Sequence, residues 1–271
     1  INFILSHIKE DGSISESINN RNYNTAVAIT ALQATANPKY NQIIENGQRF
    51  IKGLQLSESN GYKPEHKFFG GIGYGGDERP DLSNAYMALE ALKATSLDPQ
   101  DPVWEKALVF VSRSQNNSET NDLDWAKNDG GFAYMPEFSP HGEAVSYGGM
   151  THAGLISLLF AGIDKNDARV KTAFNWIMAN YTLDNNPGAK NNQGLFYYYH
   201  AFAKSMTAYG EAVVTDNNGI AHNWRNDLGG KLLILQNDDG SWINRDSPRW
   251  WEGNKNLVTA WSVIALNHVI R

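Results

Sequence analysis

The sequence predicts an all-α fold, an α/α toroid of about five to six helical hairpins, and three repeated features indicate it. Helices that end in an aromatic and a β-branched residue recur, as at Phe50-Ile51. A glycine turn follows each of these helices, and a helix rich in alanine, glycine and serine follows each turn. The turn glycines Gly71 and Gly131 are 60 residues apart. This period is typical of stacked helix pairs, and we expect residues 1–271 to form a single domain.

The elements are expected in the same order in each of five units. Gln55, which lies four residues after Ile51, illustrates the polar residue that closes a first helix. Glycine then permits the positive φ of a tight reversal. Because small residues let helices approach closely, we expect the second helices in an inner layer and the more charged first helices outside. The first helices end near Ile8, Gln55, Gln115, Tyr181 and Gln236; the turns lie at 11–14, 71–74, 131–134, 194–197 and 239–242; the second helices lie at 25–32, 85–92, 153–159, 201–206 and 259–266.

The composition excludes several classes of protein. Hydrophobic residues make up 41% and charged residues 19%, with a net charge of -6 and no basic stripe, so no nucleic-acid partner is expected. There is no cysteine, which excludes disulfides, thiolate nucleophiles and cysteine-ligated zinc. The longest nearly apolar run, 153–163, is shorter than the ~20 residues of a membrane span. The chain begins with Ile1, so we expect a processed or truncated N-terminus, which is compatible with export but leaves the compartment open.

The segment from Gly230 to Trp242, GKLLILQNDDGSW, closely resembles the glutamine–tryptophan repeat of squalene–hopene cyclases and other class II terpene cyclases. Degenerate copies cover the rest of the chain, and the same hairpin repeat occurs in the β subunits of protein prenyltransferases. The resemblance implies an α/α toroid whose central cavity binds a bulky hydrophobic or isoprenoid-like substrate. It also implies that Gln236 and Trp242 tie an outer helix to the next turn, and that about six hairpins close the ring where five are counted here.

The catalytic signatures of these families are not reproduced. Squalene–hopene cyclases use an Asp-x-Asp-Asp acid, and the nearest match, Asp122-Leu123-Asp124-Trp125, lacks the last aspartate. The zinc site of prenyltransferases needs a cysteine. The sequence therefore predicts no metal and no cofactor. Asp81 is well placed to cap the helix that follows it, which is a structural role.

Four residues are candidates for acid–base catalysis. Alignment of the inner helices by their small residues puts His152 and His200 at the same repeat position, near the starts of adjacent helices. An imidazole there can exchange a proton near neutral pH, although each histidine can equally bond to a neighbouring turn. Asp124 and Glu143 lie in longer loops and complete the candidate set. The alternative for these two carboxylates is ordinary solvated loop charge.

Five aromatic residues are candidates for substrate binding: Tyr86, Tyr147, Tyr199, Trp250 and Trp251. Aromatic faces line apolar pockets, stabilise cations or stack on sugar rings, and they also form ordinary cores. Two further functions therefore stay open beside the isoprenoid-binding one. The first is a polysaccharide lyase or glycosidase, because α/α toroids also host those activities, and the second is a non-catalytic binding module. The expected partner is a small hydrophobic molecule or a saccharide.

Overall fold

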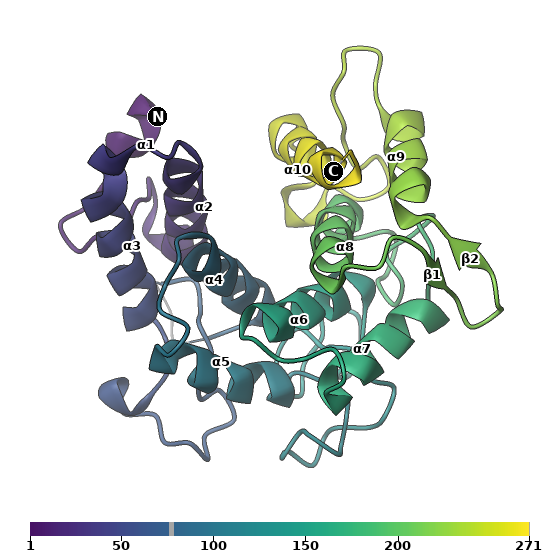
Figure 1. Cartoon of the computed structure of the whole chain (residues 1–271), viewed down its shortest axis with the longest axis horizontal. Coiled ribbons are helices and arrows are strands. Elements are labelled where there is room, and N and C mark those ends of the chain that lie inside the picture. The colour runs from purple at the N-terminus through teal and green to yellow at the C-terminus, as the bar shows by residue number, and fades with distance from the viewer. Residues whose placement is uncertain (76–78, 271) are drawn as a thin grey trace.

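The helices form an arc of two layers (Figure 1). The computed structural model describes residues 1–75 and 79–270. Consecutive inner helices pack against one another along the arc, and Figure 1 places α2 and α10 at its opposite ends. The small-residue helices thus form the inner layer, as predicted. The inner helices are α2 (Arg21–Ala34), α4 (Leu82–Ala94), α6 (Gly148–Phe160), α8 (Leu195–Tyr209) and α10 (Lys255–Val269); outside them lie α1 (Asn2–Leu5), α3 (Asn41–Gly53), α5 (Pro102–Arg113), α7 (Ala168–Ala179) and α9 (Trp224–Leu235).

A small antiparallel hairpin departs from the predicted all-α composition. β1 (Val214–Thr215) pairs with β2 (Ala221–His222) between α8 and α9. Strands of two residues are too short to show the alternating pattern from which strands are predicted. Single turns of 3-10 helix complete the secondary structure: η1 (Ile18–Asn20), η2 (Pro38–Tyr40), η3 (Glu58–Asn60) and η4 (Arg249–Trp251).

Close packing explains why the inner helices need small residues. A Cβ atom added to Gly154 of α6 would lie 2.5 Å from the ring of Phe132. The alanines on the packed faces of α4, such as Ala88, are fully buried. Larger side chains at these positions would push neighbouring helices apart, because protein interiors leave little free volume.

A glycine and a glutamine join each unit to the next outer helix. Gly70 has a φ of +82°, and an added Cβ would overlap the carbonyl oxygen of Lys106 in α5. Gln55 Nε2 donates to the carbonyl oxygens of Gly70 (3.1 Å) and Val103 (3.0 Å), so it links the turn to the first turn of α5. The left-handed residue is therefore the glycine before the predicted Gly71. The next unit repeats these contacts: Gln115 bonds to Gly130 and Arg169, and Gly130 meets Thr172 of α7.

The fifth unit has the same turn, but here the turn is exposed to solvent. Gln236 Nε2 donates to Gly240 O at 3.0 Å, and Gln236 is exposed whereas Gln55 is buried. Around Gly240 (φ +80°), the nearest atom to an added Cβ is Gln236 Nε2 at 3.9 Å. Trp242 is buried and donates through Nε1 to Leu232 O of α9. The turn geometry is thus retained without an outer helix against it in the described part of the chain.

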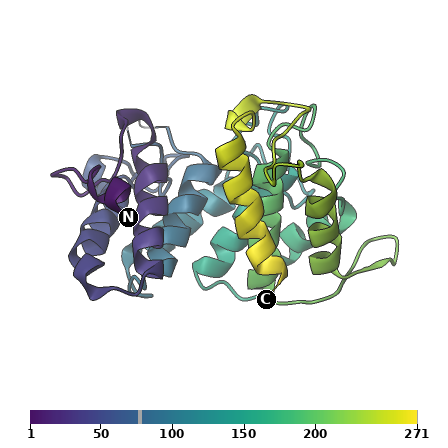
Figure 2. The same ribbon diagram turned by 90° about the horizontal axis from the view of Figure 1, so that it is seen from above.

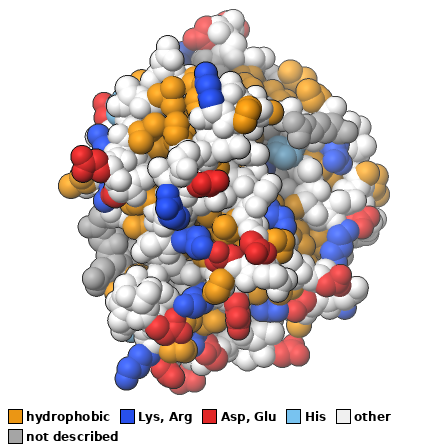
Figure 3. Space-filling view, turned by 60° about the vertical axis from the view of Figure 1, so that its left-hand side comes forward, with side chains coloured by type: hydrophobic (Ala, Val, Ile, Leu, Met, Phe, Trp, Pro, Cys, Tyr) orange, Lys and Arg blue, Asp and Glu red, His pale blue; other side chains and the backbone are white. Residues whose placement is uncertain are grey.

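The two ends of the arc remain apart in the view from above (Figure 2). Lysine and arginine side chains are interspersed with aspartate and glutamate on the face shown in Figure 3. Among residues 1–75 and 79–270, no helix combines the length and the apolar character needed to cross a bilayer.

Candidate functional site

Two repeat turns bring tyrosines to the start of α4. The carbonyl of Tyr74 accepts the N–H of Asn22 in α2 (3.0 Å), and the carbonyl of Tyr134 accepts the N–H of Leu82 in α4 (2.8 Å). Each turn therefore sits on the N-terminus of an inner helix. Because the two turns have the same geometry in adjacent units, their hydroxyls meet at 3.1 Å.

Asp81 is the N-cap of α4 and lies beneath these turns. Its Oδ1 accepts the backbone N–H of Asn84 (2.9 Å), and its Oδ2 accepts the side-chain amide of the same residue (2.9 Å). The predicted cap is thus confirmed. Asp81 is only 2% exposed, and burial raises the pKa of its carboxyl to about 6, although hydrogen bonds from Asn84 and Tyr134 oppose the shift. The carboxyl therefore holds a proton at mildly acidic pH.

Five tyrosines lie near enough to this carboxyl for its charge to raise their pKa, and together with Asp81 we call them the Asp81 cluster. Tyr23 Oη lies 2.8 Å from Ser83 Oγ, and burial raises the pKa of Tyr23, with the Asp81 charge adding to the shift. Burial also raises the pKa of the other phenols, so all five hydroxyls stay neutral. The site combines one proton-holding carboxyl with five neutral phenol groups. The tyrosines are Tyr23, Tyr74, Tyr134, Tyr147 and Tyr197, from α2, two turns, the N-cap of α6, and α8.

Further along α4, a polar side chain reaches α8. Glu90 of α4 forms an ion pair with Lys204 of α8, and both side chains are largely buried. Tyr86 lies one turn before Glu90, and His200 lies one turn before Lys204. A polar contact thus joins two inner helices that are separated along the arc by α6.

Three predicted site residues lie in or near this region. Tyr147 belongs to the Asp81 cluster, and its ring meets His141 edge-on at 4.5 Å. Tyr86 is fully buried on α4. His200 is buried on α8 with neither ring nitrogen hydrogen-bonded, and burial, followed by the charge of Lys204, lowers its pKa well below the usual value. His200 is therefore neutral.

His152 lies between α6 and α8, in the interior of the packing. Its Nδ1 is 2.6 Å from Ser205 Oγ, and its ring centroid is 4.9 Å from that of Phe202. Burial lowers its pKa to about 3. The contacts are those of a neutral core histidine.

The predicted repeat position of His152, level with Thr25 and Thr259, is wrong by one residue. Thr151 Oγ1 accepts the N–H of Phe132 (3.1 Å), as Thr259 Oγ1 accepts that of Trp242 in the fifth unit (3.1 Å) and Thr25 accepts that of Ile14 in the first. Thr151 is therefore the residue equivalent to Thr25 and Thr259. Small residues occur on more than one side of α6, so their spacing did not fix the rotation of this helix.

The other predicted residues lie apart from the Asp81 cluster. Asp124 and Glu143 are exposed loop residues. Tyr199 is buried in α8 and donates to Leu183 O at 2.6 Å. Trp250 and Trp251 have φ values of +61° and +65°, which are strained for residues other than glycine. Trp251 is 75% exposed, and the guanidinium of Arg249 lies over the ring of Trp250.

A second buried carboxyl, Glu252, lies at the N-terminus of α8. Its Oε1 accepts the N–H of Tyr197 (2.8 Å), and its Oε2 accepts from Asn244 Nδ2 (2.6 Å). Burial raises the pKa of Glu252 to about 7. Oε1 thus ties the loop before α10 to α8, and Oε2 orders the loop itself, which gives this carboxyl a positioning role.

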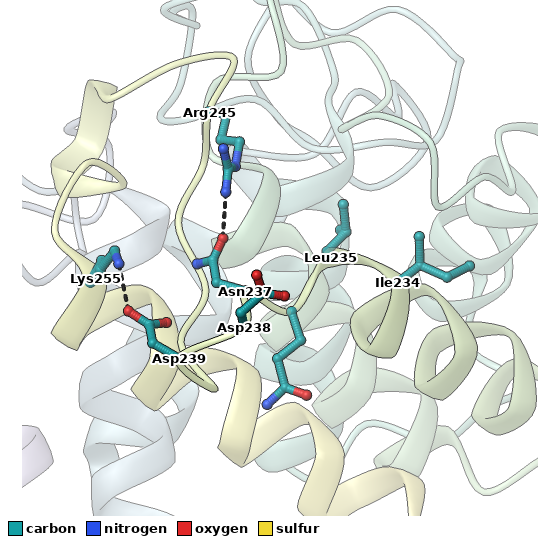
Figure 4. Close-up of a pocket in the computed structure, with 8 residues that line it drawn as sticks. Ile234, Leu235, Asn237, Asp238, Asp239, Arg245 and Lys255 are labelled. Carbon is teal, nitrogen blue, oxygen red and sulfur yellow. Dashed lines mark hydrogen bonds and ion pairs between the residues drawn. The ribbon is translucent and has the colours of Figure 1, made fainter.

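A groove of about 490 Å³ lies at the α9–α10 end of the arc (Figure 4). Two contacts involve its charged side chains: Lys255 pairs with Asp239 (2.8 Å), and Arg245 donates to Asn237 (2.6 Å). These pairs are solvated, and the Lys255 ammonium lowers the pKa of Asp239. Charged and polar side chains line much of this open groove, which distinguishes it from the buried Asp81 cluster. Within the described residues, no three histidine, aspartate or glutamate side chains are grouped to hold a metal ion.

The acid role of Asp81 was not predicted from the sequence. Its position before α4 was explained by helix capping alone, and the tyrosines near it come from other repeat units. The recurring aromatic after each glycine turn was the available signal, because Tyr74 and Tyr134 occupy equivalent positions.

Comparison with protein families and with curated proteins gives no match. Solved structures of a type II terpene cyclase, MstE from Scytonema, superpose on the whole arc. A variant of that enzyme bound to its product, merosterolic acid A, matches 98% of this chain and 70% of its own, with a TM-score of 0.65 and 14% identity. The chain has a terpene cyclase-like fold. This fold is shared by MstE bound to its substrate, geranylgeranyl dihydroxybenzoate (TM-score 0.63, 14% identity, 98% and 70% coverage), and by a protein from Actinoplanes (0.61, 12%, 98% and 72%).

Proposed function

We propose that this protein is an enzyme that cyclises an isoprenoid-like substrate by proton transfer from Asp81. One observation carries the proposal: a buried carboxyl with a pKa of about 6 lies among five neutral tyrosines at the N-terminus of an inner helix. The terpene cyclase-like fold supports it, and the MstE neighbour acts on a prenylated substrate.

Asp81 in its acid form would protonate a terminal alkene of the substrate. A C–H bond forms from the alkene π electrons, the Asp81 O–H bond breaks, and the neighbouring carbon becomes cationic. An internal alkene then attacks that carbon, and loss of a proton from the last cation leaves a cyclic product with the same formula as the substrate. Asp81 recovers its proton from solvent.

The surrounding residues would position the acid and stabilise the cation. Asn22 donates to Asn84 O and Oδ1, and Asn84 in turn holds both oxygens of Asp81. This chain of contacts fixes the carboxyl before the reaction. The faces of the tyrosine rings carry negative electrostatic potential, which stabilises a passing cation.

We also propose that the arc is part of an α/α toroid and that residues 1–271 act as one domain. The repeat contacts support this arrangement: Gln55 and Gln115 each tie a turn to the next outer helix, and Gln236 with Trp242 preserves the same turn at the open end. The family motif in which glutamine and tryptophan connect successive units accounts for these contacts.

The decisive experiment uses deuterated water. The protein is incubated with linear isoprenoid alkenes, and the products are analysed by mass spectrometry and NMR. Protonation-initiated cyclisation gives a cyclic isomer carrying one deuterium at the protonated carbon. A cyclic product without deuterium, or no cyclic product from any substrate, contradicts the proposal.

The rate of cyclisation should fall as the pH rises through about 6. Only protonated Asp81 can act as the acid, and with a pKa of about 6 its protonated fraction drops about tenfold for each unit above that pH. Initial rates measured from pH 5 to pH 8 test this, with circular dichroism at each pH to confirm that the protein stays folded. A rate that is constant or increases over this range is inconsistent with an acid role for Asp81.

A further inference from the structure

Helices α4 and α8 present polar side chains to each other at matching intervals. Ser83, Tyr86 and Glu90 follow one face of α4, since residues three and seven positions apart lie on the same side of a helix. Tyr197, His200 and Lys204 follow one face of α8 with the same spacing. The two faces therefore form two parallel rows.

The two rows of side chains are near each other at both ends. At one end, Tyr197 is near enough to Tyr23 and Ser83 for both to influence its pKa, which burial raises above the usual value. At the other end, Glu90 and Lys204 form the ion pair that joins α4 to α8. Tyr86 and His200 occupy the middle position of each row.

Several polar atoms between these ends lack a well-formed hydrogen bond. They are the hydroxyls of Tyr86 and Tyr197 and both ring nitrogens of His200. Glu90 raises the pKa of Tyr86 through its charge and through a distorted side-chain hydrogen bond, after the larger effect of burial, and this contact does not reach standard hydrogen-bonding geometry. Buried polar groups are nearly always hydrogen-bonded, so several without a well-formed bond in one place indicate a position for a polar ligand atom or an ordered water.

The protonation states define what these atoms can bind. Burial keeps both phenols protonated, so each donates one hydrogen bond. His200 is neutral, so one ring nitrogen donates and the other accepts. Trp261 of α10 adds an aromatic wall, with its ring centroid 5.8 Å from that of Tyr197 and 6.3 Å from that of His200. The two phenol hydroxyls and the imidazole can bond to an oxygen atom, and the aromatic ring can contact the apolar remainder of the same molecule.

We propose that Tyr86, Tyr197 and His200 form a subsite for the oxygen-bearing group of the substrate. The identification of that molecule as an isoprenoid rests on the proposed function. The subsite selects a hydroxyl, carbonyl or phenol oxygen over a bare hydrocarbon. It also disfavours a diphosphate, because the nearby Lys204 ammonium is already neutralised by Glu90.

Binding of three ligands of equal chain length tests the subsite: geranylgeraniol, the C20 hydrocarbon without its hydroxyl, and geranylgeranyl diphosphate. The Asp81→Asn variant prevents turnover, and quenching of tryptophan fluorescence reports binding in detergent micelles. The alcohol should bind at least about tenfold more tightly than the hydrocarbon and more tightly than the diphosphate. Equal binding of alcohol and hydrocarbon, tightest binding of the diphosphate, or no binding of any ligand overturns the proposal.

Three tyrosine variants locate the effect. Tyr86→Phe and Tyr197→Phe, each added to Asp81→Asn, should reduce the alcohol preference by about fivefold or more. Tyr198→Phe is the matched control, because Tyr198 Oη is engaged with Thr182 O at 2.7 Å. A preference that survives both subsite variants overturns the assignment of these residues. Since binding is measured without turnover, the subsite can stand if the deuterium experiment fails, and it can fail if that experiment succeeds.

Discussion

Asp81→Asn is expected to reduce the rate of cyclisation by about 10²- to 10⁴-fold, the usual contribution of a positioned general acid. Asparagine has nearly the same shape as aspartate, and its Oδ1 can still accept the N–H of Asn84 and cap α4. Its amide cannot supply a proton to an alkene. The loss should therefore appear in kcat, with a small change in KM. Thermal stability should also fall, because the new Nδ2 faces the Asn84 amide that Asp81 Oδ2 accepts in the wild type.

Asp167→Asn is the matched control for this substitution. Asp167 is the N-cap of α7 and accepts the N–H of Arg169 through Oδ1 (2.9 Å), so it shares the capping role of Asp81 in an outer helix. This variant should cyclise substrate at nearly the wild-type rate. Glu252→Gln tests which of the two buried carboxyls is the acid. If Glu252→Gln abolishes turnover while Asp81→Asn remains active, the acid is Glu252.

The repeat was predictable because its determinants are local. The glycine turn and the closing glutamine recur at constant spacing, and Gln55 and Gln115 make equivalent contacts. The content of small residues predicted whether each helix lies in the inner or the outer layer. It did not predict the rotation of α6 about its axis: the N–H of Phe132 in the turn bonds to Thr151 and not to His152.

The candidate site was less predictable because it depends on contacts between units. Asp81 becomes a proton-holding acid only when turns from two units and side chains from α2, α6 and α8 bury it. In the sequence these tyrosines are up to 174 positions apart, from Tyr23 to Tyr197. Trp250 and Trp251 were predicted as site residues because they lie in an irregular loop, whereas their strained backbone is visible only in the structure.

Gly70→Ala is expected to cost more than about 3 kcal/mol of the free energy of unfolding, a large fraction of the 5–15 kcal/mol typical of a folded protein. Gly70 has a left-handed backbone (φ +82°), in which an alanine costs roughly 1–2 kcal/mol. The added Cβ would also overlap the carbonyl of Lys106, so α5 would have to move away and the bond from Gln55 to Val103 would weaken. Urea denaturation followed by circular dichroism measures the loss.

Gly240→Ala separates the two contributions, because it has the same turn geometry without the close approach. Its φ is +80°, and an added Cβ would find only Gln236 Nε2, at 3.9 Å. This variant should lose only the ~1–2 kcal/mol of backbone strain. The difference between the two variants therefore measures the cost of displacing the next outer helix. Equal losses would mean that the glycine is required for its backbone conformation alone, and that contact with the following helix does not account for its recurrence in the repeat.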